Sequence, residues 1–91
     1  MKETNYEYAM NIAWQIEPVE NFVYIYNFLN NNFLLLESVS KYIWECIPTD
    51  VCASNIAQNI SAKYNIDFET AVNDVKNFLE TLFEHGVVKK I

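Results

Sequence analysis

The stretch Phe33-Leu34-Leu35-Leu36-Glu37-Ser38-Val39-Ser40-Lys41-Tyr42-Ile43-Trp44 decides the fold, because it begins as a strand and becomes a helix within one or two residues. Four consecutive apolar residues after three asparagines predict a short strand that is partly covered on both faces. Ser38 is expected to be the N-cap of the helix, with its hydroxyl accepting from the backbone N–H of Ser40 or Lys41. Apolar residues then recur at helical spacing from Val39 onward. A sheet is therefore expected before this junction, and helices after it.

Two further strands are predicted before the junction, which gives a three-stranded antiparallel meander. Apolar and polar residues alternate from Met10 to Glu17, which is typical of a half-buried strand. The segment 21–29 is apolar or aromatic on both faces, as a central strand would be. The asparagines at 30–32 supply a hairpin turn, since asparagine tolerates positive φ. The segment 32–36 is then an edge strand with one row of unpaired backbone groups.

The aromatic residues of segment 21–29 have two interpretations that the sequence leaves open. They can shield the outer face of a sheet that packs on one side only. They can also form a docking face for a larger enzyme, since a large exposed apolar patch often marks an interaction site.

Three helices are expected after the junction. The first runs over 38–47 and is stopped by Pro48, and the second is capped by Thr49 or Asp50, with Val51 opening its apolar stripe. Asp67 is the expected N-cap of the third, and a C′ glycine ends that helix before two valines that pack on the core. The whole chain, 1–91, is predicted to be one domain, with 1–8 as a loose N-terminal arm.

Composition and charge exclude several classes of function. The 91 residues include twelve acidic residues, six lysines and no arginine, for a formal net charge of −6. A nucleic-acid binder needs basic residues to replace condensed counterions, so no nucleic-acid partner is expected. No apolar run suits a membrane span or signal peptide, which predicts a cytoplasmic protein without a membrane partner.

The sequence predicts neither catalysis nor a cofactor. Cys46 and Cys52 form no C-x-x-C pair, and with the lone His85 they match no familiar metal spacing. They are interpreted as reduced, half-buried thiols, and the histidine as a structural residue beside the end of the third helix. Neither a Gly-rich phosphate loop nor a Ser/His/Asp arrangement is present.

Three runs give the chain a resemblance to a known family. The run Leu36-Glu37-Ser38-Val39-Ser40-Lys41-Tyr42-Ile43-Trp44-Glu45 is similar to the "L-N-x-x-x-x-x-I-W-x" signature of the pyrroloquinoline-quinone synthesis protein D (PqqD) family. The run from Asp74 to Leu82, followed by His85-Gly86-Val87-Val88, resembles its "D-V-x-x-F-L-x-x-L…x-G-L-[LI]" ending. Between them, Ile56-Ala57 and Tyr64-Asn65-Ile66 resemble its "ELA…Y-x-[VI]" segment. The chain departs from the pattern at Glu37, where the family usually has Asn, and in its glycine-free hairpin at 27–33.

The resemblance implies an α+β fold of winged helix-turn-helix type and a non-catalytic role. Family members are recognition elements for ribosomally synthesised, post-translationally modified peptides (RiPPs). They bind the leader segment of a precursor peptide and present it to a maturation enzyme, such as a radical-SAM enzyme, a cyclase or the leader peptidase of a lasso peptide. The leader adds as an antiparallel strand to the edge at 32–36 and lies against the third helix, which is β-augmentation.

The candidate peptide-binding residues follow from this mode of binding. The pairing edge would consist of Asn32, Phe33, Leu34, Leu35 and Leu36, and the helical wall of Ala71, Asp74, Val75 and Phe78. Val75 and Phe78 can equally be core residues. The Asp74 carboxylate can select a Lys or Arg of the leader, or it can be a solvated charge on the helix.

A second class of function stays open beside peptide binding: an acidic winged-helix adaptor or DNA mimic in transcription regulation. The free edge and the aromatic segment 21–29 are compatible with a monomer or a weak homodimer. The sequence names neither the precursor peptide nor the partner enzyme.

Overall fold

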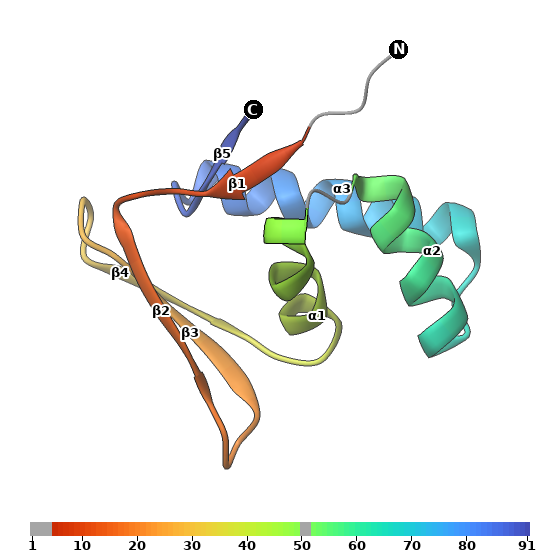
Figure 1. Ribbon diagram of the computed structural model, residues 1–91, viewed down its shortest axis with the longest axis horizontal. Helices are drawn as coiled ribbons and strands as arrows, with labels where there is room; N and C mark the ends of the chain where they lie inside the picture. Colours follow the sequence, from red (N-terminus) through yellow and green to blue (C-terminus); the bar gives the residue numbers. More distant parts are fainter. Residues whose placement is uncertain (1–4, 50–51) are drawn as a thin grey trace.

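The computed structural model describes residues 5–49 and 52–91 and shows a sheet and a helical layer joined at the predicted junction (Figure 1). The elements, in chain order, are β1 (Tyr6–Tyr8), β2 (Ile12–Glu17), β3 (Phe22–Asn27), β4 (Asn32–Leu36), α1 (Val39–Cys46), a 3₁₀ turn (Ile47–Thr49), α2 (Ala53–Tyr64), α3 (Phe68–Glu84) and β5 (Val88–Lys90).

The three-stranded meander is confirmed. Its order is β2-β3-β4, every pair is antiparallel, and β3 is the central strand. Asn21 and Asn31 supply the positive φ that the two hairpin turns require, at 60° and 59°. The register aligns Trp14 with Ile25 and Leu34, so these three side chains share one face of the sheet.

The helices cover only one face of this sheet. Val23 and Ile25 on the covered face of β3 are fully buried, whereas Tyr24 between them is 39% exposed. Burial of this face and of one stripe on each helix forms the core, because apolar area removed from water is the main stabilising term. Among the described residues, no second layer covers the opposite face of the sheet, and Figure 1 shows the strands extending away from the helices.

The N-terminal segment is not a loose arm where the structure describes it. Residues Tyr6–Tyr8 form β1, which pairs antiparallel with β5 at the other end of the chain. The Tyr8 hydroxyl donates to the Trp44 carbonyl oxygen at 2.8 Å, and the two rings stack at 4.3 Å. Burial raises the pKa of Tyr8 above its usual value. The prediction is wrong for this segment because its partner strand is 80 or more positions away in the sequence. Residues 1–4 lie outside the described residues.

Ser38 is the N-cap residue of α1, as predicted, but the predicted capping hydrogen bond is wrong. Ser38 has φ 55° and ψ −125°, and its hydroxyl makes no capping hydrogen bond. The chain turns from strand to helix so sharply that this residue takes a positive φ. An N-cap needs backbone angles near the β region, so the side chain is not placed to reach the first turn.

The start of α2 differs from the prediction, whereas both ends of α3 agree with it. Cys52 is at the N-cap of α2 without a side-chain bond, and the Thr49 hydroxyl donates back to the Cys46 carbonyl oxygen. Asp50 and Val51 lie outside the described residues. Asp67 caps α3 by accepting from the Thr70 N–H, and Gly86 follows the helix with φ 74°.

A buried asparagine connects the sheet to the end of α3. The Asn27 side chain is 3% exposed, and its Nδ2 donates to the His85 carbonyl oxygen at 2.9 Å. Its Oδ1 accepts from the Leu29 N–H and from Asn11 Nδ2, and Asn11 Nδ2 also donates to the Gly86 carbonyl oxygen. A buried amide is tolerated only when its groups are paired, and these bonds pair them. They also bring the C-terminus of α3 to the hairpin between β3 and β4.

Asn27→Ala removes the central member of this network and leaves a buried N–H and a carbonyl oxygen unpaired. We expect it to lower the free energy of unfolding by about 2–3 kcal/mol. The exposed Asn73→Ala is the matched control, with an expected change within about 0.5 kcal/mol. Urea unfolding followed by tryptophan fluorescence measures both, and equal effects of the two substitutions would contradict a linking role for Asn27.

Candidate functional site

The outer edge of β4 is the first part of the candidate site. Because β4 is the last strand of the sheet, alternate residues direct their N–H and C=O groups away from β3. The segment Asn32–Leu36 contains neither Lys nor Pro, the residues that usually discourage pairing at an edge. Phe33 and Leu35 are 67% and 51% exposed on one face, whereas Leu34 and Leu36 turn toward the core on the other.

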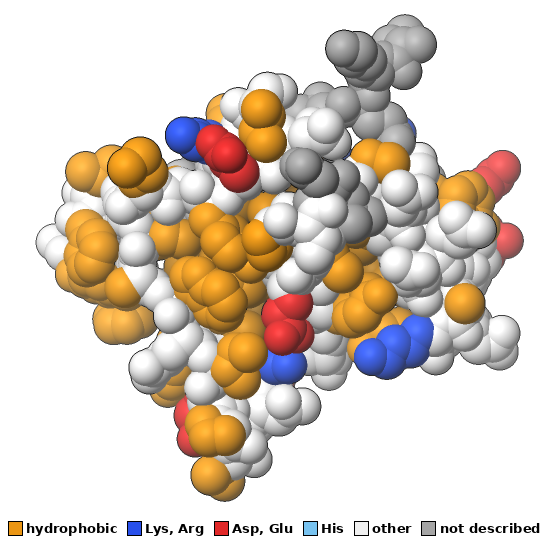
Figure 2. All heavy atoms as spheres, in the orientation of Figure 1, with side chains coloured by type: hydrophobic (Ala, Val, Ile, Leu, Met, Phe, Trp, Pro, Cys, Tyr) orange, Lys and Arg blue, Asp and Glu red, His pale blue; other side chains and the backbone are white. Residues whose placement is uncertain are grey.

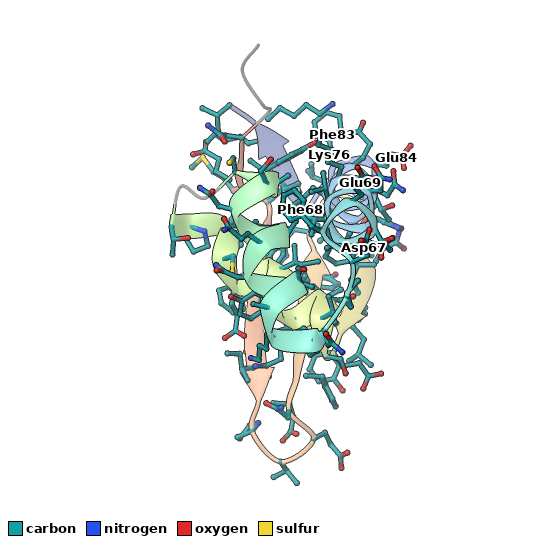
Figure 3. The ribbon with its side chains drawn as sticks, turned by 90° about the vertical axis from the view of Figure 1, so that its right-hand side faces the viewer. Asp67, Phe68, Glu69, Lys76, Phe83 and Glu84 are labelled. Carbon is teal, nitrogen blue, oxygen red and sulfur yellow. The ribbon has the colours of Figure 1, made fainter. Side chains whose placement is uncertain are left out.

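Helix α3 is the second part, and the Asn27 network places it. Asn27 is opposite Asn32 in the β3–β4 register and is bonded to the end of α3, so the start of β4 lies beside the C-terminus of this helix. Figure 3 looks along α3 and shows Lys76 and Phe83 on the side away from the three-stranded sheet. Successive residues of an α-helix are rotated by about 100° around its axis. Asp74 and Phe78 therefore lie on the opposite flank of α3, on the side of the three-stranded sheet.

The predicted wall residues occupy different depths on α3. Ala71 and Val75 are each 1% exposed and belong to the hydrophobic core. Phe78 is partly buried against the same core, and Asp74 is exposed. Asp74 and Phe78 therefore contribute to the surface of this flank, whereas Ala71 and Val75 belong to the core beneath it.

The electrostatic character of this region is acidic. Glu37, directly after β4, and Asp74 are both exposed carboxylates. Three of the described lysines form ion pairs: Lys41 with Glu45, Lys89 with Glu7 and Lys90 with Glu80. The other two are Lys63, which lies over the Tyr42 ring, and Lys76, which is on the far flank of α3. A positively charged ligand would meet an attractive field here, which salt would screen.

The sequence did not predict the shape of the uncovered face of the sheet. A shallow depression of about 450 Å³ lies here, and the residues around it include Ala13, Gln15, Tyr24, Tyr26 and Phe33. The alternation of side chains within each strand indicated that aromatic residues lie on this face. The register between the three strands was needed to place the small Ala13 in one row with Tyr26 and Phe33. Figure 2 shows apolar side chains gathered over the strands and between the strands and the helices on the face turned to the viewer.

Both cysteines are free and half-buried, and burial raises the pKa of the Cys46 thiol. Among residues 5–49 and 52–91, no three His, Cys, Asp or Glu side chains come close enough to hold a metal ion. The same residues contain no helix with the length and hydropathy needed to cross a bilayer.

Comparison with known proteins identifies the family. The sequence profile described as Coenzyme PQQ synthesis protein D (PqqD) matches residues 23–88, which span β3 to the start of β5. The chain belongs to the PqqD family. Proteins of this family, also called RiPP recognition elements, are non-catalytic peptide-binding chaperones.

A solved structure shares the PqqD-family fold of this chain. It is described as "TbiB1 in Complex with the TbiA(beta) Leader Peptide" and superposes with a TM-score of 0.81, covering 91% of this chain and 94% of the other at 18% identity. At this identity the likeness shows the fold, including the meander followed by three helices. A search of curated proteins gives no match.

The different depths on α3 lead to an expected difference in stability. Val75→Ala opens a cavity in the core and should lower the free energy of unfolding by about 2 kcal/mol. Asp74→Ala, one position earlier on the exposed flank, should change it by less than about 0.5 kcal/mol. Chemical denaturation of both variants measures the two effects. A large loss for Asp74→Ala would mean that its carboxylate stabilises the fold and is not free for a ligand.

Proposed function

We propose that this chain binds the leader segment of a ribosomally synthesised precursor peptide by strand addition to β4. The observation that carries the proposal is the unprotected edge Asn32–Leu36, whose first residue pairs with Asn27, the side chain that bonds to the C-terminus of α3. The leader would continue the antiparallel pattern of the sheet. Its backbone would pair with Asn32, Phe33, Leu34, Leu35 and Leu36, and its inward side chains would contact Leu34 and Phe78.

The comparisons support this function. The PqqD family consists of peptide-binding chaperones, and the structure that shares the fold of this chain is a complex with a leader peptide. Both candidate surfaces, the last strand of the meander and the long C-terminal helix, lie within the part of the chain that the family profile covers or adjoins.

The role in peptide maturation is delivery. A chain that holds the leader leaves the following core peptide free to enter a separate active site, so we propose that it works with a partner maturation enzyme. A radical-SAM enzyme, a cyclase and a leader peptidase are all compatible with this role. We propose a cytoplasmic monomer or weak homodimer.

Strand addition predicts a specific response to N-methylation of the leader backbone. In an antiparallel strand, alternate residues direct their N–H groups to β4, and the residues between them direct theirs to water. Methylating residues of the first kind one at a time should weaken binding at least about tenfold, because a hydrogen bond is lost and a methyl group clashes. Methylating the others should change binding by less than about twofold.

Fluorescence anisotropy with synthetic leader peptides from candidate precursors measures this pattern. The matched control is the same peptide series with the side chains, rather than the amides, truncated to alanine. Equal losses at every methylated position would contradict strand addition, as would an absence of any effect.

The Asp74 carboxylate is proposed to attract a Lys or Arg of the leader. Asp74→Asn should weaken binding about threefold at low salt, the size of an exposed ion pair, and the difference should vanish near 1 M salt as the charges are screened. Glu69→Gln at the N-terminus of α3 removes the same charge and serves as the control. Titrations at about 0.05 M and about 1 M salt make the comparison, and equal affinities of wild type and Asp74→Asn at low salt would remove this role.

A further inference from the structure

The two edges of the sheet differ on the uncovered face. The outward side chains of β2 in the middle of the sheet are Ala13 and Gln15, which are small or polar. On β4, the corresponding side chains in the same cross-strand rows are Phe33 and Leu35. Of the two edge strands, β4 is therefore the one that presents large apolar residues in these rows.

These β4 side chains have a neighbour on one side only. Phe33 packs against Tyr26 with ring centroids 4.9 Å apart, and Leu35 lies next to Tyr24 in the register. Toward the free edge they meet solvent, which leaves them 67% and 51% exposed. No charged residue interrupts these two rows, since their remaining members are Ala13 and Gln15.

An added strand would place its own side chains against this surface. Successive residues of a strand point to opposite faces, and residues directly opposite on neighbouring strands have Cβ atoms about 5 Å apart. Two leader residues, separated by one, would therefore lie beside Phe33 and Leu35. The residue between them would point to Leu34 on the covered face.

We infer that Phe33 and Leu35 form an outer subsite for the leader, so that this chain selects a leader segment with consecutive apolar residues rather than an alternating one. The inference rests on the proposed function and goes beyond it by naming the sequence pattern of the peptide. Both faces of the added strand would be in apolar contact: the outer one with Phe33 and Leu35, the inner one with Leu34 and Phe78.

A displayed library of random peptides about twelve residues long tests the inference, because it covers a typical strand with its flanks. Selection on the full chain should enrich peptides with three or more consecutive apolar residues. Selection on the Phe33→Ser/Leu35→Ser variant should enrich peptides that are apolar at alternate positions, because only the inner contacts remain. The same pattern from both proteins would overturn the outer subsite.

The affinity of one enriched peptide gives the second readout. Phe33→Ser should weaken it about fivefold, as the loss of an aromatic cross-strand pair and its buried area predicts. The control is Phe68→Ser, which removes a 46% exposed ring from α3 away from β4 and should leave the affinity within about twofold. Circular dichroism verifies that both variants are folded.

The failure of the inference and that of the proposed function give different results. Selection that yields no peptides, or peptides whose NMR shifts fall away from β4, contradicts strand addition itself. Peptides that shift β4 amides but ignore Phe33→Ser contradict only the outer subsite. Sedimentation supplies one more outcome: if Phe33→Ser dissociates a dimer and leaves peptide affinity unchanged, a second copy covers this face and the inference is wrong.

Discussion

The position of α3 beside the sheet depends on one buried amide. Asn27 ends the central strand, and its side chain bonds to the Leu29 N–H, the Asn11 side chain and the His85 carbonyl oxygen. Gly86 lies so close that a Cβ there would approach Asn27 Nδ2 to 3.1 Å, and its φ of 74° suits glycine. The hairpin before β4 and the C-terminus of α3 are therefore held together.

The second constraint is that the helical layer covers one face of the sheet only. A sheet of three strands in a chain of this size has two free edges, and here one face also stays open to solvent. Strand β4 contains neither Lys nor Pro and exposes its own Phe33 and Leu35, features that disfavour solubility in isolation. A peptide strand would cover both the open backbone and these side chains.

Local pattern was enough to predict much of this architecture. The apolar run after the asparagine turn correctly predicted a strand over Asn32–Leu36. Asp67 and Gly86 were correctly predicted to mark the two ends of α3. The β1–β5 pair was missed because it joins the two ends of the chain, and the positive φ of Ser38 because it follows from how tightly the strand meets α1. For the candidate site, spacing placed Ala71, Asp74, Val75 and Phe78 on one side of α3. Spacing alone does not predict which of these side chains are buried. The packing of the helix shows that Ala71 and Val75 are buried, Phe78 is half-buried and Asp74 is exposed.

The measurement that tests the central claim most directly is an NMR titration of the ¹⁵N-labelled chain with candidate leader peptides. Strand addition predicts amide shifts concentrated on Asn32–Leu36 and on the Asp74 and Phe78 flank of α3, with slowed hydrogen exchange in β4 at saturation. Shifts confined to the opposite edge, Ile12–Glu17, or to the open face of β3 would contradict the account, since another surface would then bind the peptide.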